Sequence, residues 1–96
     1  MSETEPRQIR VVHHPEQAEL DRRGVFLWDV WSKDPSCFPW TYSEKEVCYL
    51  LEGEAIVTPE GGEPVPISAG DFVEFPKGLT CTWDVKQHVR KHYAIE

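Results

Sequence analysis

The chain has 96 residues, 40% of them hydrophobic, and a formal net charge of −7. A chain of this length builds one domain around one modest core. The negative charge argues against a nucleic-acid partner, which needs clustered Lys and Arg, and against an anionic membrane surface. The first residues contain no apolar run, so we expect no signal peptide and no membrane span. With three cysteines, an odd number, we expect a reducing, cytoplasmic location.

The N-terminal quarter of the chain is predicted to be simple in structure. Residues 1–7 are polar and are expected to form a poorly ordered tail. A short edge strand is predicted over residues 9–12. A short helix that begins near Pro15 is predicted to stop at Gly24. We therefore expect residues 1–23 to hold a tail, a short strand and a helical turn.

Residues 24–96 are predicted to form a domain of short strands. Pro39 bends its strand or holds it at a sheet edge, Gly53 makes a corner, and Gly61 and Gly62 lie in a hairpin loop. The predicted strands cover residues 25–31, 38–42, 46–51, 54–58, 65–67, 72–75, 79–85 and 89–95. Many short strands separated by turns favour an all-β sandwich or barrel.

Two stretches of the chain have motif-like spacing. In the first, Glu46 and Gly53 are separated by six residues, and Trp40 and Tyr42 precede Glu46. In the second, a short apolar strand follows Gly70 and leads through a Pro-Lys-Gly turn to Cys81. Proline has no N–H for a sheet ladder, so it ends this strand before the next one begins.

These motifs resemble the two conserved motifs of the cupin superfamily, which implies a double-stranded β-helix, or jelly-roll barrel. The three positions that are metal-binding histidines in many cupins hold Trp40, Tyr42 and Cys81 here. A third stretch, residues 89–93, matches a subgroup of very small cupins related to the ureidoglycine aminohydrolases. The resemblance extends from Gly24 to the C-terminus.

Inward-facing residues of the barrel are predicted from strand alternation. The motif positions of Trp40, Tyr42, Glu46 and Cys81 point into the barrel in cupins. By the same parity, Cys48 and Trp83 join them. A strand of residues 46–51 is expected to be buried on both sides, because its other face is also apolar. The predicted ligand pocket comprises Trp40, Tyr42, Glu46, Cys48, Cys81, Trp83 and Lys91.

Glu46 and Cys81 are the candidate catalytic residues. A buried carboxylate needs a partner, and we expect Tyr42 or an indole N–H to supply a hydrogen bond. Glu46 is then a general acid/base, a ligand anchor, or a structural carboxylate without chemistry. Cys81 holds a ligand position of the superfamily, and the alternative is a small hydrophobic core residue, which we prefer for Cys48.

Lys91 is predicted on the same face as Val89 and Tyr93 of the last strand. It either reaches into the barrel, to bind a ligand carboxylate or to pair with Glu46, or lies on the rim with its ammonium in water. Trp28 and Trp31 are predicted on opposite faces of an early strand, one in the core and one at a subunit contact.

The sequence favours a small-molecule-binding cupin, catalytic or not, without the usual histidine-bound metal and without a cofactor. Tryptophan has no lone pair for a metal, and neutral tyrosine is a poor ligand. The alternatives are a metal-dependent hydrolase of the ureidoglycine aminohydrolase type and a structural domain without chemistry. A homodimer is expected, because so small a domain buries little surface alone and because its exposed sheet edge is better covered.

Overall fold

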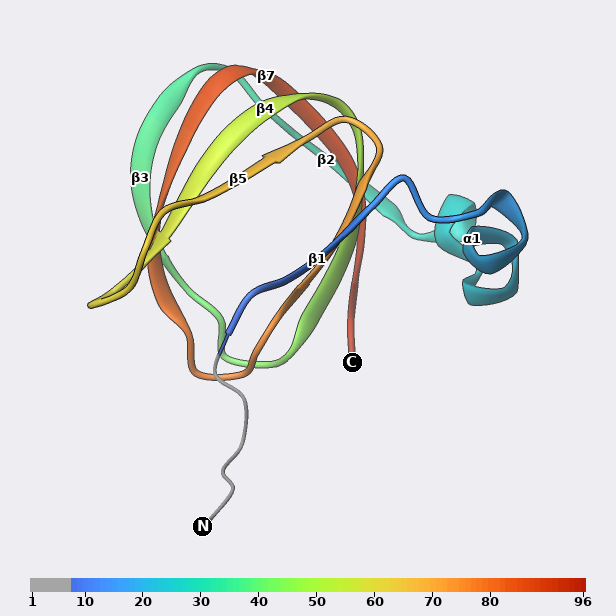
Figure 1. The fold of residues 1–96 in the computed structure, drawn as a ribbon, viewed down its shortest axis with the longest axis horizontal. Helices are drawn as coiled ribbons and strands as arrows, with labels where there is room; N and C mark the ends of the chain where they lie inside the picture. Colours follow the sequence, from blue (N-terminus) through green and yellow to red (C-terminus); the bar gives the residue numbers. More distant parts are fainter. Residues whose placement is uncertain (1–7) are drawn as a thin grey trace, which may run out of the picture.

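A computed structural model describes residues 8–96, which form seven strands of one antiparallel sheet and one short helix. The sheet curves round into the shape of a barrel, as Figure 1 shows, which confirms the predicted all-β barrel with one short N-terminal helix. The predicted tail, residues 1–7, lies outside the described residues. The strands are β1 Arg10–His13, β2 Asp29–Lys33, β3 Ser36–Thr41, β4 Glu46–Pro59, β5 Val65–Ser68, β6 Asp71–Phe75 and β7 Thr80–Ile95.

Two long strands, β4 and β7, form the centre of the sheet. They pair with each other from Glu46 opposite Ile95 to Pro59 opposite Cys81, and the other strands attach to them. The sequence suggested that each was two strands, with a corner at Gly53. Instead β4 continues through Gly53, which has φ +94°, and the register shifts on either side of it form bulges.

Gly53 is required at this bulge for two reasons. Its positive φ is unfavourable for any residue with a Cβ atom. A Cβ atom there would also lie 2.0 Å from the carbonyl oxygen of His88 on β7. The glycine therefore lets two backbones approach closely, and the strands stay paired where a corner was predicted.

Strand β3 passes through Pro39 without interruption. It pairs on one side with β7, where Pro39 lies opposite Thr82. Proline removes a hydrogen-bond donor, but an edge strand can turn that position to solvent. The predicted edge location is confirmed, and the strand is not broken at Pro39.

The N-terminal helix α1 spans Gln17–Arg23 and ends at Gly24, which adopts the left-handed conformation with φ +71°. This agrees with the predicted stop at Gly24. The strand predicted over residues 25–31 is wrong in its first half. Because Gly24 reverses the chain, Val25–Leu27 forms a 3₁₀ turn, and β2 begins at Asp29.

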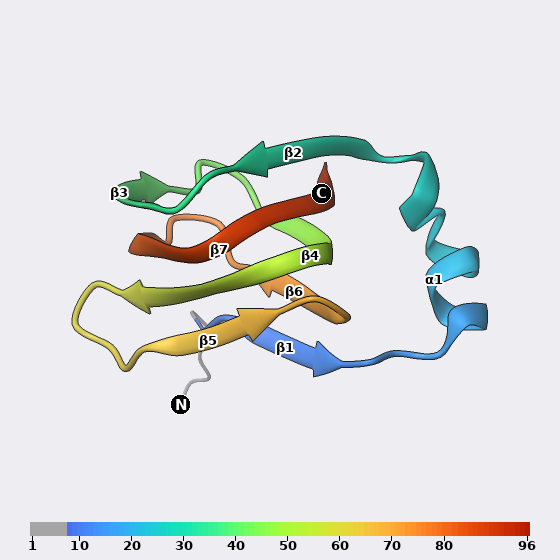
Figure 2. The same cartoon turned by 90° about the horizontal axis from the view of Figure 1, so that it is seen from above.

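Helix α1 lies outside the barrel, at one side of it in both views (Figures 1 and 2). Its Leu20 and the adjoining Val25 pack against Val47 of β4 and Phe72 of β6. Val47 is fully buried by this contact, and Cys48 is fully buried on the opposite face. The prediction that the start of β4 is buried on both sides is therefore confirmed.

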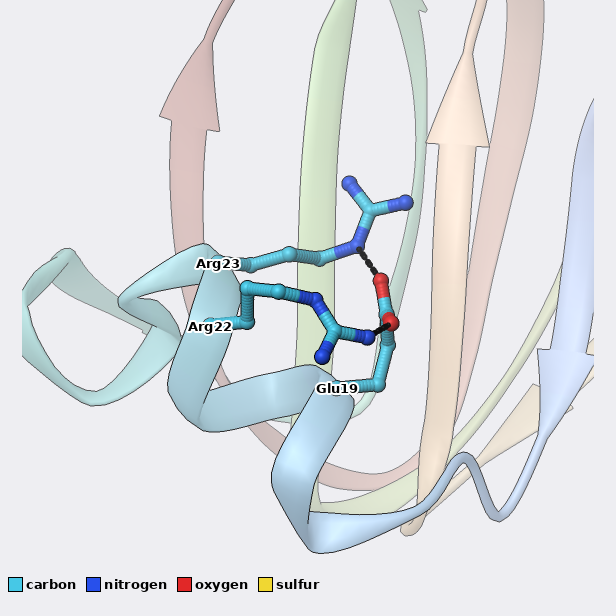
Figure 3. Close-up of polar contacts among 3 residues, drawn as sticks. All are labelled: Glu19, Arg22 and Arg23. Carbon is cyan, nitrogen blue, oxygen red and sulfur yellow. Dashed lines mark hydrogen bonds and ion pairs between the residues drawn. The ribbon is translucent and has the colours of Figure 1, made fainter.

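Two ion pairs link residues on the exposed side of α1. Figure 3 shows the carboxylate of Glu19 between the guanidinium groups of Arg22 and Arg23, with Arg23 Nε 3.0 Å from Glu19 Oε2. The guanidinium of Arg23 also lies 4.6 Å from the centre of the Phe72 ring. Such a cation–π contact helps to hold α1 over β6. No helix among residues 8–96 is long and apolar enough to cross a membrane.

Candidate ligand-binding site

The interior of the barrel contains a cavity of about 170 Å³ with walls that are mainly aromatic. Half of the Trp40 side chain is exposed, so the cavity meets solvent beside this residue. Aromatic walls with a few converging polar groups are typical of small-molecule sites. The lining residues are Trp31, Phe38, Trp40, Tyr42, Glu46, Trp83, Lys91 and Tyr93.

Sheet register explains why these residues meet. Trp31 of β2 lies directly opposite Lys91 of β7, and Phe38 of β3 lies opposite Trp83 of β7. Alternation along β7 then places Tyr93 on the same face as Lys91. Three separate strands thus direct large side chains to one point inside the barrel.

Glu46 and Lys91 form a buried ion pair in this cavity. The ammonium of Lys91 donates a hydrogen bond to Glu46 Oε2 over 3.0 Å. Only 8% of Glu46 and 4% of Lys91 is exposed. Of the two sequence-based alternatives for Lys91, the structure therefore places it inside the barrel, paired with Glu46, and not on the rim.

Aromatic rings surround the Lys91 ammonium. Its nitrogen lies 4.8 Å from the ring centre of Trp83, 5.0 Å from that of Trp31 and 5.7 Å from that of Phe75. Each such contact stabilises a desolvated cation by about 0.5–2 kcal/mol. The rings and the Glu46 carboxylate together offset the cost of removing the ammonium from water.

Tyr42 contributes a neutral hydroxyl to the site. Its ring stacks on Phe75, with centroids 4.6 Å apart, and its oxygen accepts a hydrogen bond from Trp83 Nε1 over 3.1 Å. Burial and the nearby charge of Glu46 raise the pKa of Tyr42 far above its ordinary value. The sequence predicts that Tyr42 or an indole N–H donates to Glu46. In the structure the indole of Trp83 donates to Tyr42, and the donor to Glu46 is Lys91.

Cys48 and Cys81 are buried in the barrel core. Burial raises the pKa of each thiol to about 11, although the charge of Lys91 opposes the shift. Both are therefore thiols at neutral pH, not the thiolates that nucleophilic chemistry needs. Cys81 Sγ donates to the backbone oxygen of Trp40 over 3.6 Å. Neither side chain is part of the cavity lining, so the geometry gives the proposed catalytic role of Cys81 no support.

Metal ligands do not converge within the part of the chain that the structure describes. Residues 8–96 contain no group of three or more His, Cys, Asp or Glu side chains placed to hold one ion. His13, one of the adjacent histidine pair near the N-terminus, pairs with Asp71 over 2.7 Å. His92 contacts the backbone oxygen of Trp28 over 3.0 Å.

Sequence reasoning placed five of the eight lining residues in the pocket and missed Trp31, Phe38 and Tyr93. Tyr93 carried a usable signal, because it alternates onto the face of Lys91. For Trp31 the sequence predicts the core or a subunit contact, on a strand shared with Trp28. In the structure Trp28 precedes β2 and packs beside Phe72 outside the barrel.

An antiparallel β-barrel with a cavity lined by inward-facing strand residues is the architecture of a cupin. The sequence matches the EutQ-like cupin domain over residues 20–93, most of the chain, and the protein belongs to this family. The family confirms the cupin resemblance. The narrower resemblance to ureidoglycine aminohydrolases stays a prediction.

Several solved and curated proteins are similar. A DUF861-family protein from Thermotoga maritima has 42% identity and a TM-score of 0.90, with 93% of this chain and 100% of that chain covered. A putative ethanolamine utilization protein Q from Salmonella typhimurium has 36% identity and a TM-score of 0.61, over 67% of this chain and 51% of that one. The curated "Acetate kinase EutQ" of Salmonella typhimurium is 35% identical over 71 residues, which are 74% of this chain and 28% of that protein.

Proposed function

We propose that this protein is a cupin that binds a small molecule in its barrel cavity without a histidine-bound metal. The observation that carries the proposal is the Glu46–Lys91 ion pair inside an open, aromatic-walled cavity. In this proposal the pair anchors the polar part of the ligand, and rings such as Trp31 and Trp83 contact its apolar part.

A buried ion pair is poor evidence for a purely structural role. Apolar residues of similar volume in the same place often leave stability unchanged or raise it. The pair also retains hydrogen-bonding capacity, since an ammonium has three donors and a carboxylate accepts several hydrogen bonds. Polar capacity facing a cavity is what a ligand site uses, which favours binding over a structural domain without chemistry.

Glu46 is the group best placed for proton transfer, because it is a carboxylate facing the cavity. Its hydrogen bond from Lys91 holds the carboxylate in a fixed orientation. Anchoring is therefore the primary role that we propose for Glu46, and proton transfer to or from a bound ligand would use the same oxygens.

The metal-dependent alternative has weaker support. This chain resembles the ureidoglycine aminohydrolases in its sequence motifs. The motif positions that are metal-binding histidines in many cupins, however, hold Trp40, Tyr42 and Cys81 here. Of these, Cys81 is a buried thiol bonded to a backbone oxygen, outside the cavity lining. The kinase activity named for the Salmonella relative belongs to a protein of which this chain covers 28%.

Indole N–H signals in proton–nitrogen NMR spectra test the binding function. A fragment set of small polar molecules is added to the labelled protein. Trp31 and Trp83 line the cavity and should shift, whereas Trp28, which packs outside the barrel, is an internal control. A set that shifts none of the cavity indoles, or shifts only Trp28, contradicts the proposal.

Variants then tie binding to the ion pair. Glu46→Gln keeps the size of the side chain and is expected to weaken a hit that uses the carboxylate. Glu52→Gln is the matched control, because Glu52 lies on the same strand and is exposed. Equal weakening in both variants, or in neither, would assign the binding to another part of the protein.

A further inference from the structure

We propose that the ligand is a small, net-neutral molecule that presents a hydrogen-bond acceptor next to a donor, as an amide group does, on a flat apolar body. This inference rests on the proposed binding function, and it names the chemical class that the site selects. The observations that carry it are the charges, the hydrogen-bonding groups and the walls of the cavity.

The charge of the site is balanced before any ligand enters. The negative Glu46 and the positive Lys91 lie 3.0 Å apart, and both residues are buried. Their neighbours add no charge at neutral pH, because Tyr42 stays a neutral phenol and Cys48 a neutral thiol. A charged ligand would leave one charge uncompensated in a desolvated space, which is unfavourable.

The hydrogen-bonding groups of the pair are of opposite kinds and adjacent. Lys91 Nζ has donors beyond the one that it gives to Glu46. Glu46 is an acceptor with capacity beyond the one bond from Lys91. An amide has a carbonyl oxygen to accept from Lys91 and an N–H to donate to Glu46, so one uncharged group satisfies both.

The walls and the size of the cavity determine the rest of the ligand. Trp31, Phe38 and Trp83 offer ring surfaces on which a flat apolar body can pack. A cavity of about 170 Å³ is small for a ligand site. A single small ring with one polar group suits this volume.

Benzamide, benzoate and benzamidine form a matched set of probes. They share one ring and differ in charge, which is zero for benzamide, negative for benzoate and positive for benzamidine. NMR titration at pH 7, followed at the indole signals of Trp31 and Trp83, gives a dissociation constant for each. We expect benzamide to bind at least about tenfold more tightly than either charged probe.

Removing one charge should reverse the preference. In Glu46→Gln the Lys91 ammonium is unbalanced, and benzoate should become the tightest probe. In Lys91→Met the Glu46 carboxylate is unbalanced, and benzamidine should become the tightest. Glu52→Gln and Lys86→Met change exposed residues of the same two strands and should keep the preference for benzamide.

The outcomes separate this inference from the binding function. A charged probe that binds the parent protein best, at the cavity indoles, overturns the neutral-ligand inference and leaves the binding function standing. Retention of the benzamide preference in both charge-removing variants also overturns the inference. No shift of the cavity indoles with any of the three probes overturns the inference, and the binding function is then decided by the fragment set. If either variant fails to fold, the order in which the parent protein binds the three probes still decides the neutral-ligand inference.

Discussion

The substitution Lys91→Met tests whether the Glu46–Lys91 pair is as tightly coupled as its geometry indicates. Methionine fills much of the space of the lysine stem but removes the ammonium, its hydrogen bond to Glu46 and its contacts with three rings. The Glu46 carboxylate would remain 8% exposed and without its partner. The variant therefore measures the cost of an uncompensated charge inside the barrel.

The expected magnitudes follow from burial. Loss of one partner from a buried pair costs about 3–5 kcal/mol, a large part of the roughly 5–14 kcal/mol that a 96-residue domain has in total. Glu46→Gln should cost less, about 1.5–3 kcal/mol, because the amide oxygen still accepts from Lys91. The double variant should lie within about 1 kcal/mol of the parent, or be more stable, because neither charge remains.

Urea denaturation at pH 7 measures all four proteins of this cycle. With a slope of about 2 kcal/mol/M, a loss of about 4 kcal/mol lowers the midpoint by about 2 M. We expect a coupling energy of at least about 2 kcal/mol between positions 46 and 91. Single effects that add to the double effect within about 0.5 kcal/mol would refute a coupled buried pair.

Three further predictions concern other parts of the chain. Stability should fall as pH rises from 9 to 11, because the pKa of Cys48 is raised from 9.0 to about 11 in the folded state and only the unfolded chain loses the proton in that range. Urea denaturation at alkaline pH should show a smaller fall for Cys48→Ala than for Cys37→Ala, which changes an exposed cysteine. Equal falls in the two variants would count against the raised pKa. Gly53→Ala should lower the free energy of unfolding by more than about 4 kcal/mol, whereas Gly61→Ala, where a Cβ atom meets nothing within 4 Å, should lower it by about 1–2 kcal/mol. Thermal melting compares the two variants, and similar melting points would contradict the close backbone approach at Gly53. Light scattering should give twice the 11.1 kDa of one chain. Leu27 is apolar and 91% exposed, as expected of an interface residue, so Leu27→Glu should reduce the mass to that of one chain. A mass of one chain for the parent protein would rule out the homodimer.

Local rules predicted a chain of short strands, and the resemblance to the cupin motifs narrowed the fold to a barrel and put Glu46 on an inward face. Period-two alternation added Trp83 and placed Lys91 on the same face as Tyr93. The end of helix α1 at Gly24 could also be predicted from the sequence, because a glycine in the left-handed conformation commonly ends a helix. These features depend on neighbours in the chain and need no knowledge of which strands pair.

The partner of Glu46 was left open by the sequence, because that choice depends on long-range register. Lys91 lies 45 residues away, and the two meet only through the pairing of β4 with β7, in which Glu46 lies opposite Ile95 and Leu50 opposite Lys91. A one-residue change of register would turn Lys91 to the outer face. No local pattern encodes the number of bulges between two strands.

Strand alternation predicts which face of the sheet a side chain is on, but it does not predict whether that side chain lines the cavity or is buried in the core. Cys81 is expected in the pocket from its motif position and Cys48 from parity, but both belong to the buried core and are absent from the cavity lining. Trp31 was misjudged for a different reason. The 3₁₀ turn after Gly24 moves the start of β2 to Asp29, which separates Trp31 from Trp28.

A crystal structure of the protein with benzamide tests the central claim most directly, namely that the Glu46–Lys91 pair anchors a small neutral ligand in the barrel. We predict benzamide in the cavity, with its carbonyl oxygen within about 3.2 Å of Lys91 Nζ and its amide nitrogen within the same distance of a Glu46 oxygen. A cavity that stays without benzamide, or a benzamide whose amide group points away from both residues, would contradict the claim.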